Sequence, residues 1–221
     1  MKKFCFYLLL FFFYIPISAQ VAVRYEPRHK VALENEYIRL LDVRIQPGDT
    51  SLFHIHEIPS FFIPLSSTAI GSEIKGQEAQ ESKFIAGATW YNGFEKGPLI
   101  HRVWNSDTNV LHVIDLELLS AKNGILPPIQ LPGPGIDFEN EKLRVYKFEM
   151  APGQSVPLPL LKTPMLFISV SGPMLKVKDA GKKDLSYDVR PGSFQWLMPQ
   201  ENFVLSNKGP VTASIILILL K

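Results

Sequence analysis

Three histidines in the first half of the chain have the residue type and spacing of a metal site. His54 and His56 are separated by one residue, so on a β-strand both imidazoles lie on one face, close enough to bind one cation. His101, from a distant segment, would be a third ligand that leaves coordination positions open for water or substrate. That layout is typical of a catalytic rather than a structural metal site.

The segments that must position these histidines are predicted to be β-strands. Residues 39–45 and 143–150 alternate between apolar and polar, residues 214–220 form an apolar run, and turn signals such as Pro47-Gly48 and Pro152-Gly153 recur along the chain. No stretch of the mature chain has a sustained helical period. Short strands punctuated in this way predict an all-β fold, a barrel or a sandwich.

The chain is predicted to contain two copies of one unit. Residues 34–48 and 139–153 share six identical positions without a gap, and the register extends, with one three-residue deletion, to Asn105 and Asn207. The Pro/Gly segment between the copies, residues 121–136, cannot form the interior of a helix or strand and is interpreted as a linker. We therefore expect barrels at residues 20–120 and 137–221.

The repeat also predicts which side chains face the barrel interiors. Residues 41, 43 and 45 of the first copy and the equivalent residues 146, 148 and 150 of the second are all apolar. The same holds for residues 61, 63 and 65 and their equivalents 166, 168 and 170. Both sets are therefore expected to point into the barrels. The positions of His54, His56, residue 61 and His101 correspond to Pro159, Leu161, Leu166 and Phe203. The second barrel should therefore be filled with hydrocarbon, whereas the first keeps three polar rings that each need a partner.

The N-terminus predicts export. Residues 1–19 combine Lys2 and Lys3, a twelve-residue apolar run and a small-residue end, which is the pattern of a signal peptide and too short for a membrane span; an uncleaved anchor is the alternative. We expect a periplasmic or secreted protein with no membrane span after cleavage. Cleavage removes the single cysteine, Cys5, and leaves 21 basic against 21 acidic residues, which argues against nucleic acid as a partner.

Two segments resemble the motifs of the cupin superfamily, whose first motif is G-x5-H-x-H-x3–4-E-x6-G. Gly48, five residues and His54-Ile-His56 match its first half, and residues 93–105, which end in His101-x3-Asn105, are similar to the second motif, G-x5-P-x-G-x2-H-x3-N, with shifted Gly and Pro spacing. The resemblance covers nearly the whole mature chain as a bicupin. It implies two double-stranded β-helix (jelly-roll) barrels, with one mononuclear metal in the first and no ligands in the second.

One departure from the cupin pattern concerns the glutamate of the first motif. Its position is occupied by Ser60 or Phe61, and Glu57 has the opposite strand parity to His56. We therefore expect three neutral imidazoles without a carboxylate, a site that leaves the full positive charge of the metal in the pocket and favours an anionic ligand or bound hydroxide. The alternative is a decayed site in which the histidines only pack.

Several further residues are candidates for the pocket. With Asp115 and Glu117 assigned outward, His112 is expected to face inward as a fourth ligand, a hydrogen-bond donor to a ligand, a proton shuttle or a hydrogen-bonded core residue. Arg39 has inward parity, but Arg144 repeats it in the unit without ligands, which favours a structural role. Asn105 repeats as Asn207, which favours a turn role. Phe61, Trp90 and Tyr91 are expected to line the pocket or to pack beside it, and His29 is expected to be solvated.

These observations leave three functional hypotheses. The first is an exported metalloenzyme that uses one divalent ion (iron, manganese, zinc or nickel) on a small, anionic molecule, by dioxygenase-, isomerase- or hydrolase-like chemistry, with the resemblance to cupins favouring a dioxygenase. The second is a non-enzymatic binder of a small ligand or metal. The third is a structural dimerisation module of the cell envelope. Under each hypothesis the resemblance to cupins implies a homodimer.

Overall fold

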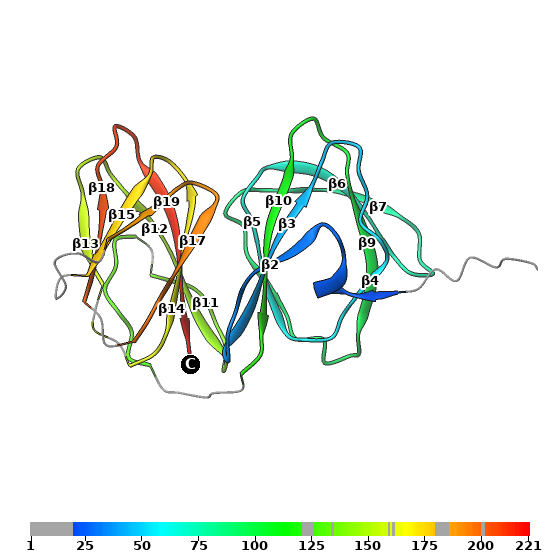
Figure 1. Ribbon diagram of the computed structural model, residues 1–221, viewed down its shortest axis with the longest axis horizontal. Coiled ribbons are helices and arrows are strands. Elements are labelled where there is room, and N and C mark those ends of the chain that lie inside the picture. The colour runs from blue at the N-terminus through cyan, green and yellow to red at the C-terminus, as the bar shows by residue number, and fades with distance from the viewer. Residues whose placement is uncertain are drawn as a thin grey trace, which may run out of the picture.

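The computed structural model describes residues 20–120, 126–133, 135–158, 160, 162–179, 186–199 and 202–221. Two jelly-roll barrels lie side by side, one from each half of the chain (Figure 1). This arrangement confirms the predicted all-β fold of two tandem barrels. The predicted signal peptide, residues 1–19, lies outside the described residues, and none of the helices in the described part is long and apolar enough to span a membrane.

The first barrel consists of two five-stranded sheets, in the orders β1-β4-β9-β6-β7 and β2-β3-β10-β5-β8. A short 3-10 helix, η1 (Val23–Tyr25), follows the first strand. The strands are β1 (Val21–Ala22), β2 (His29–Glu34), β3 (Ile38–Ile45), β4 (His54–His56), β5 (Ser60–Pro64), β6 (Thr68–Ile74), β7 (Gln80–Phe84), β8 (Trp90–Asn92), β9 (Leu99–Asn105) and β10 (Leu111–Leu118).

The second barrel consists of a five-stranded sheet, β11-β12-β19-β14-β17, and a four-stranded sheet, β13-β18-β15-β16. Its strands are β11 (Ile136–Glu139), β12 (Leu143–Met150), β13 (Ser155–Pro157), β14 (Met165–Ser171), β15 (Leu175–Asp179), β16 (Ser186–Val189), β17 (Ser193–Leu197), β18 (Phe203–Asn207) and β19 (Ala213–Leu220). The internal repeat is visible in the strand pairing. Strand β3 pairs antiparallel with β10 over eight residues, and β12 pairs with β19 in the same way.

The central strands β10 and β19 of two of the sheets are buried on both faces. One face of each closes its own barrel: Leu41, Val43 and Ile45 line the first interior, and Tyr146, Phe148 and Met150 the second, as predicted. The opposite faces meet between the barrels, where neighbouring strands of the two halves lie close together (Figure 1). This interbarrel cluster comprises Ile38, Leu40, Phe61, Ile63, Ile114, Leu116, Leu118, Leu143, Val145, Leu166, Ile168, Val170, Ile216, Ile218 and Leu220.

The interbarrel cluster corrects one prediction from the repeat. Residues 61 and 63, and their partners 166, 168 and 170, were expected to point into the barrels, but they face the other barrel, and Leu65 packs beside them. Phe62 borders the cavity of the first barrel, and Phe167 is part of the second core. An alternation assigns the inner face of a strand only when the outer face is polar. These strands are apolar on both faces, so the alternation does not show which face lines the barrel.

Asn105 and Asn207 have the predicted turn role in both barrels. The Asn105 amide donates to the carbonyl oxygens of Ile45 and Asn109 at 2.9 and 2.8 Å. Asn207 donates to those of Met150 and Val211 at 2.9 and 2.8 Å. Each asparagine therefore ties the end of its strand to the end of a strand in the other sheet of its barrel, β3 or β12, and to the following loop. Asn105 does not line the cavity inside the first barrel, which is described below, because both amide hydrogen bonds hold its side chain in this loop.

The described part of the predicted linker covers one end of the second barrel. Ile129 is buried in that core, and its amide donates to the Tyr146 hydroxyl at 3.1 Å. Leu126 and Leu131 pack against the same core. Residues 121–125 and 134 lie outside the described residues.

Candidate metal centre

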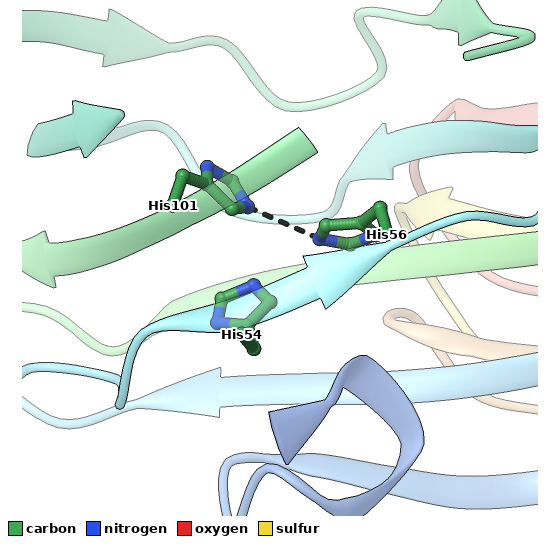
Figure 2. A group of neighbouring side chains, drawn as sticks. All are labelled: His54, His56 and His101. Carbon is green, nitrogen blue, oxygen red and sulfur yellow. Dashed lines mark hydrogen bonds between the residues drawn. The ribbon is translucent and has the colours of Figure 1, made fainter. Parts of the chain in front are cut away.

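The three predicted histidines converge inside the first barrel. Strand β4 places His54 and His56 on one face, and β9 runs antiparallel beside it with His101 directly opposite His54. The ring centroids are 4.6 Å apart for His54 and His101, and 5.0 Å for each ring to His56. Figure 2 shows the three rings turned toward one another, with Nε2 of His56 3.1 Å from Nε2 of His101. One ligand nitrogen from each ring lies within 4.8 Å of the others.

A hydrogen bond from one ring nitrogen of His54 leaves its other ring nitrogen, Nε2, free to bind a metal ion. Nδ1 of His54 donates to the carbonyl oxygen of Leu52 at 2.8 Å, and a carbonyl can only accept, so the ring proton lies on Nδ1 and the Nε2 lone pair is free. Such an outer hydrogen bond is the usual support of a metal-binding imidazole.

Burial keeps the three rings neutral. Desolvation, followed by the charges of neighbouring histidines, lowers the pKa of His54 to about 3 and the pKa of His101 to about 4, and it lowers the pKa of His56 further. Neutral imidazole is the form that coordinates a metal ion. The cluster is therefore in its ligand form at neutral pH without any change in the protein.

A cavity of about 110 Å³ adjoins the histidines. Its wall is mainly aliphatic and aromatic, and Phe62 stacks on Trp90 with ring centroids 5.2 Å apart. Phe94, which has a φ of 56°, stacks on His56 beside a surface depression that shares Asn92 and Leu99 with the cavity. The cavity lining comprises His29, Val43, Ile45, His54, His56, Phe62, Phe84, Trp90, Asn92, Leu99, His101, Val103, Leu111, Val113 and Asp115.

Comparisons with known proteins identify the fold of the chain that contains this site. No family model matches the chain, and no curated protein matches its sequence. Among solved structures, a cupin 2 conserved barrel domain protein from Leptotrichia buccalis matches 86% of each chain at 14% identity and a TM-score of 0.54. The chain has the bicupin fold. AerE from Microcystis aeruginosa (TM-score 0.58, 12% identity, 89% of this chain and 98% of that one) and a salicylate 1,2-dioxygenase from Pseudaminobacter salicylatoxidans (0.55, 9%, 83% and 71%) are also similar.

A fourth histidine, His29, borders the cavity of the first barrel, which corrects the prediction that it is solvated. Strand β2 joins the first barrel and places the His29 ring 4.5 Å from that of His54. Burial alone would raise the pKa of Glu26, but hydrogen bonds from His29 Nδ1 at 2.6 Å and from the backbone outweigh it and lower the pKa. The alternation His29, Val31, Leu33 indicates a strand, but nothing in the sequence indicates that this strand completes the barrel.

Asp115 also borders the cavity, although its parity was predicted to be outward. Its side chain is buried, and its Oδ2 lies 3.5 Å from Nδ1 of His56. Desolvation, with the charge of Glu117 adding to it, raises the pKa of Asp115 to about 8. The candidate ligand group consists of three imidazoles without a carboxylate, as expected, and the carboxyl group of Asp115 lies behind His56, on a different strand from the glutamate position of the motif. All eight residues of β10 are buried, so the acidic positions of this strand do not mark a solvent face.

His112 is not in the metal cluster, because the inverted parity of β10 turns it toward the second barrel. Its Nε2 lies 2.7 Å from Asp42 Oδ1, and its ring borders Gly192. Of the alternatives weighed for this residue, the structure favours a hydrogen-bonded, largely buried histidine between the barrels. It is neither a fourth ligand nor a proton shuttle of the cavity.

Of the five residues expected to line the pocket, only Trp90 does so. Phe61 faces the interbarrel cluster, and its neighbour Phe62 takes its place. Tyr91 packs against the interbarrel cluster. Arg39 is held by Glu117 and Glu34, at 2.6 and 2.9 Å, which supports its structural role.

In its described part, the second barrel has hydrocarbon where the first has the histidine cluster. Phe203, which corresponds to His101, is buried in the core. The amide of Leu158 donates to the carbonyl oxygen of Phe203 at 2.8 Å, so Leu158, rather than Pro159, occupies the place opposite β18 that His54 occupies opposite His101. Pro159 and Leu161 lie outside the described residues, and Leu166 points to the interbarrel cluster.

Proposed function

We propose that this bicupin binds one divalent metal ion through His54, His56 and His101 and uses it in an enzymatic reaction on a small molecule. The observation that carries the proposal is the convergence of three neutral imidazoles on one point, with His54 and His56 buried and His101 half-buried. Converging ring nitrogens whose lone pairs are not all satisfied by hydrogen bonds are costly in a barrel core, and a shared cation offsets that cost. Iron, manganese, zinc and nickel all suit such ligands.

The cavity supports a small, planar and largely apolar substrate. Its volume of about 110 Å³ is somewhat below the ~150 Å³ of an engineered cavity that holds benzene. The stacked pair Phe62 and Trp90 offers a flat wall for orienting a ring, and the aliphatic residues exclude water. The lining contains no lysine or arginine among the described residues, so a carboxylate or phenolate of the substrate would have to approach the metal itself.

Two features of the protein favour catalysis over simple binding. A three-histidine set leaves coordination positions open, and a divalent ion bound there acts as a Lewis acid and lowers the pKa of bound water. The fold is shared with a salicylate 1,2-dioxygenase, which supports dioxygenase-like chemistry on a small anionic molecule as the first reaction to test.

Metal content tests the first half of the proposal. Protein purified without an affinity tag should contain about one transition-metal ion per chain by mass spectrometry, since one three-nitrogen cluster is present. His54→Ala should lose the metal. His112→Ala is the matched control, because it removes a histidine of the same barrel that lies outside the cluster, and it should keep the metal. A metal-free wild-type protein after reconstitution with each of the four ions would refute the site.

Turnover tests the second half. The metal-loaded protein should consume oxygen or substrate in a panel of small aromatic and aliphatic acids, and His54→Ala should not. Binding of an acid to the metal without turnover would indicate a ligand-binding protein instead.

We propose in addition that the chain is exported. The N-terminal pattern of residues 1–19 supports this proposal. The mass of the mature protein from the native host should correspond to a chain that begins at Gln20, and recovery of the full-length chain from the cytoplasm would contradict export.

A further inference from the structure

Asp115 is a buried carboxylate for which the fold alone provides no partner. It lies on β10, in the cavity wall, with 1% of its surface exposed. Within the described part of the chain, neither oxygen of its carboxyl group has a partner at hydrogen-bond distance. The Ser60 hydroxyl lies near enough to lower the pKa of Asp115, but it donates to the carbonyl oxygen of Ile58 at 3.0 Å. Burying an acidic group without hydrogen bonds costs several kcal/mol in a typical protein, so its position requires a reason.

The nearest polar atom with the same deficit is Nδ1 of His56. It is buried, and it too has no hydrogen bond among the described residues. The separation from Asp115 Oδ2 is 3.5 Å, compared with about 2.9 Å for an N–H···O hydrogen bond of normal length. One proton between these two atoms would satisfy both with a movement of well under 1 Å.

The two tautomers of His56 have different consequences for this pair. A proton on Nε2 can be shared with Nε2 of His101, 3.1 Å away, but it leaves Nδ1 without a proton to donate. A proton on Nδ1 can be donated to Asp115, and it leaves the lone pair of Nε2 directed at the point where the three rings converge. His54, whose Nδ1 donates to Leu52, already has the second arrangement.

We propose that Asp115 is the positioning carboxylate of the metal site, which accepts the Nδ1 proton of His56 and thereby orients its Nε2 toward the metal. The inference rests on the proposed metal site. Asp115 occupies a different strand from the vacant glutamate position of the first cupin motif, and it acts from behind a ligand rather than as one. A cation in the cavity would favour the ionised form of Asp115, whose negative charge would then offset part of the charge that the metal brings.

Zinc affinity tests this role. Asp115→Asn retains the size of the side chain but removes the charge, and we expect zinc to bind about 10- to 100-fold more weakly in a chelator competition. Glu117→Gln is the matched control: it lies on the same strand and face, is buried, and pairs with Arg39 instead of a histidine. Its zinc affinity should equal that of the wild type. Unchanged affinity in folded Asp115→Asn would overturn the proposal.

Two further measurements separate positioning from other roles. In the metal-free protein, Asp115→Asn should change the stability to urea little, because the amide oxygen of asparagine can still accept the Nδ1 proton of His56, whereas a merely structural residue would lower stability and leave zinc affinity unchanged. X-ray absorption of the zinc-loaded wild type should show imidazole nitrogens and no carboxylate of Asp115 among the ligands. Direct coordination by Asp115 would contradict a role behind His56.

Nitrogen NMR distinguishes failure of this inference from failure of the metal site. In metal-free protein, the ¹⁵N shifts of the His56 ring should change in Asp115→Asn, while those of His54 should not. Unchanged His56 shifts would overturn the contact whatever zinc does. A wild type that binds no zinc, but whose His56 shifts do respond, would refute the metal site and the positioning role toward a metal, and would leave only the contact.

Discussion

The rings of His54, His56 and His101 make the stability of the metal-free protein depend on pH. Burial lowers the pKa of each ring well below the ordinary value of 6.5. The unfolded chain therefore takes up protons below pH 6.5 that the folded chain does not bind, so the free energy of unfolding falls as the pH falls. Each such proton contributes about 1.4 kcal/mol per pH unit, and the loss should extend from about pH 6.5 to about pH 4. The carboxyl group of Asp115, whose pKa is raised to about 8, keeps a proton in the folded state that the unfolded chain releases in this range, and it offsets the contribution of about one of the three rings.

Urea denaturation of the metal-free protein at several pH values between 7.5 and 4.5 measures this slope. A variant with leucine at positions 54, 56 and 101 should lose most of it, because the groups that titrate differently in the two states are gone. A wild-type slope equal to that of the leucine variant would show that the rings are hydrated and protonated in the folded state, contrary to their burial.

At the scale of single elements, the N-terminal arm (residues 20–34) depends on one carboxylate. Glu26 accepts hydrogen bonds from Nδ1 of His29, the Arg28 amide and the Leu52 amide, at 2.6, 2.7 and 3.1 Å. These contacts connect the arm to the loop before β4. Glu26→Gln retains the shape but exchanges one acceptor oxygen for a donor, which we expect to cost about 1–3 kcal/mol.

Hydrogen exchange measures where that cost appears. Amides of β2 and of residues 52–54 should exchange faster in Glu26→Gln, while those of the second barrel should not change. Glu36→Gln is the matched control, because Glu36 is an exposed carboxylate near the end of the same arm. Faster exchange throughout the molecule would mean that Glu26 stabilises the whole fold rather than the arm.

Strand position was predictable from the sequence, but the faces of some strands were not. The alternation at Leu41, Val43 and Ile45 and the spacing of His54, His56 and His101 depend on local geometry, and both expectations agree with the structure. The alternation of β10 was misread because both of its faces are buried: Asp115 faces the cavity, and His112 faces the second barrel. Which of two buried faces lines a cavity depends on the packing of the two barrels, and no local pattern contains that information.

His29 was missed for a different reason. Its neighbours Arg28 and Lys30 are charged and its segment precedes the repeat, so the comparison of the two copies provides no partner for it. His29 is buried because the arm pairs with β3. Nothing in the two segments' sequences indicates that they pair with each other.

At the scale of the whole molecule, the interbarrel cluster makes the two barrels one cooperative unit. Each barrel contributes a large apolar sheet face to this cluster, and each barrel alone, at about 100 residues or fewer, would expose that face. These faces are used within the chain, so the predicted homodimer needs another surface; it stays a prediction, which light scattering at micromolar concentration tests. We expect a single unfolding transition for the chain, monitored by calorimetry.

Metal binding provides the sharper test of this cooperativity. Zinc at one hundred times its Kd should stabilise the fold by about 2.7 kcal/mol, and hydrogen exchange should slow in the core strands of both barrels, although only the first contains the ligands. Phe61→Ala removes a large buried ring from the interbarrel cluster and should cost about 3–5 kcal/mol. Its zinc affinity should be retained, because Phe61 does not contact the cavity. In this variant, zinc should protect the second barrel less than the first. Equal protection of the second barrel in both proteins would show that the barrels are coupled elsewhere, and no protection of it in the wild type would show that they unfold independently.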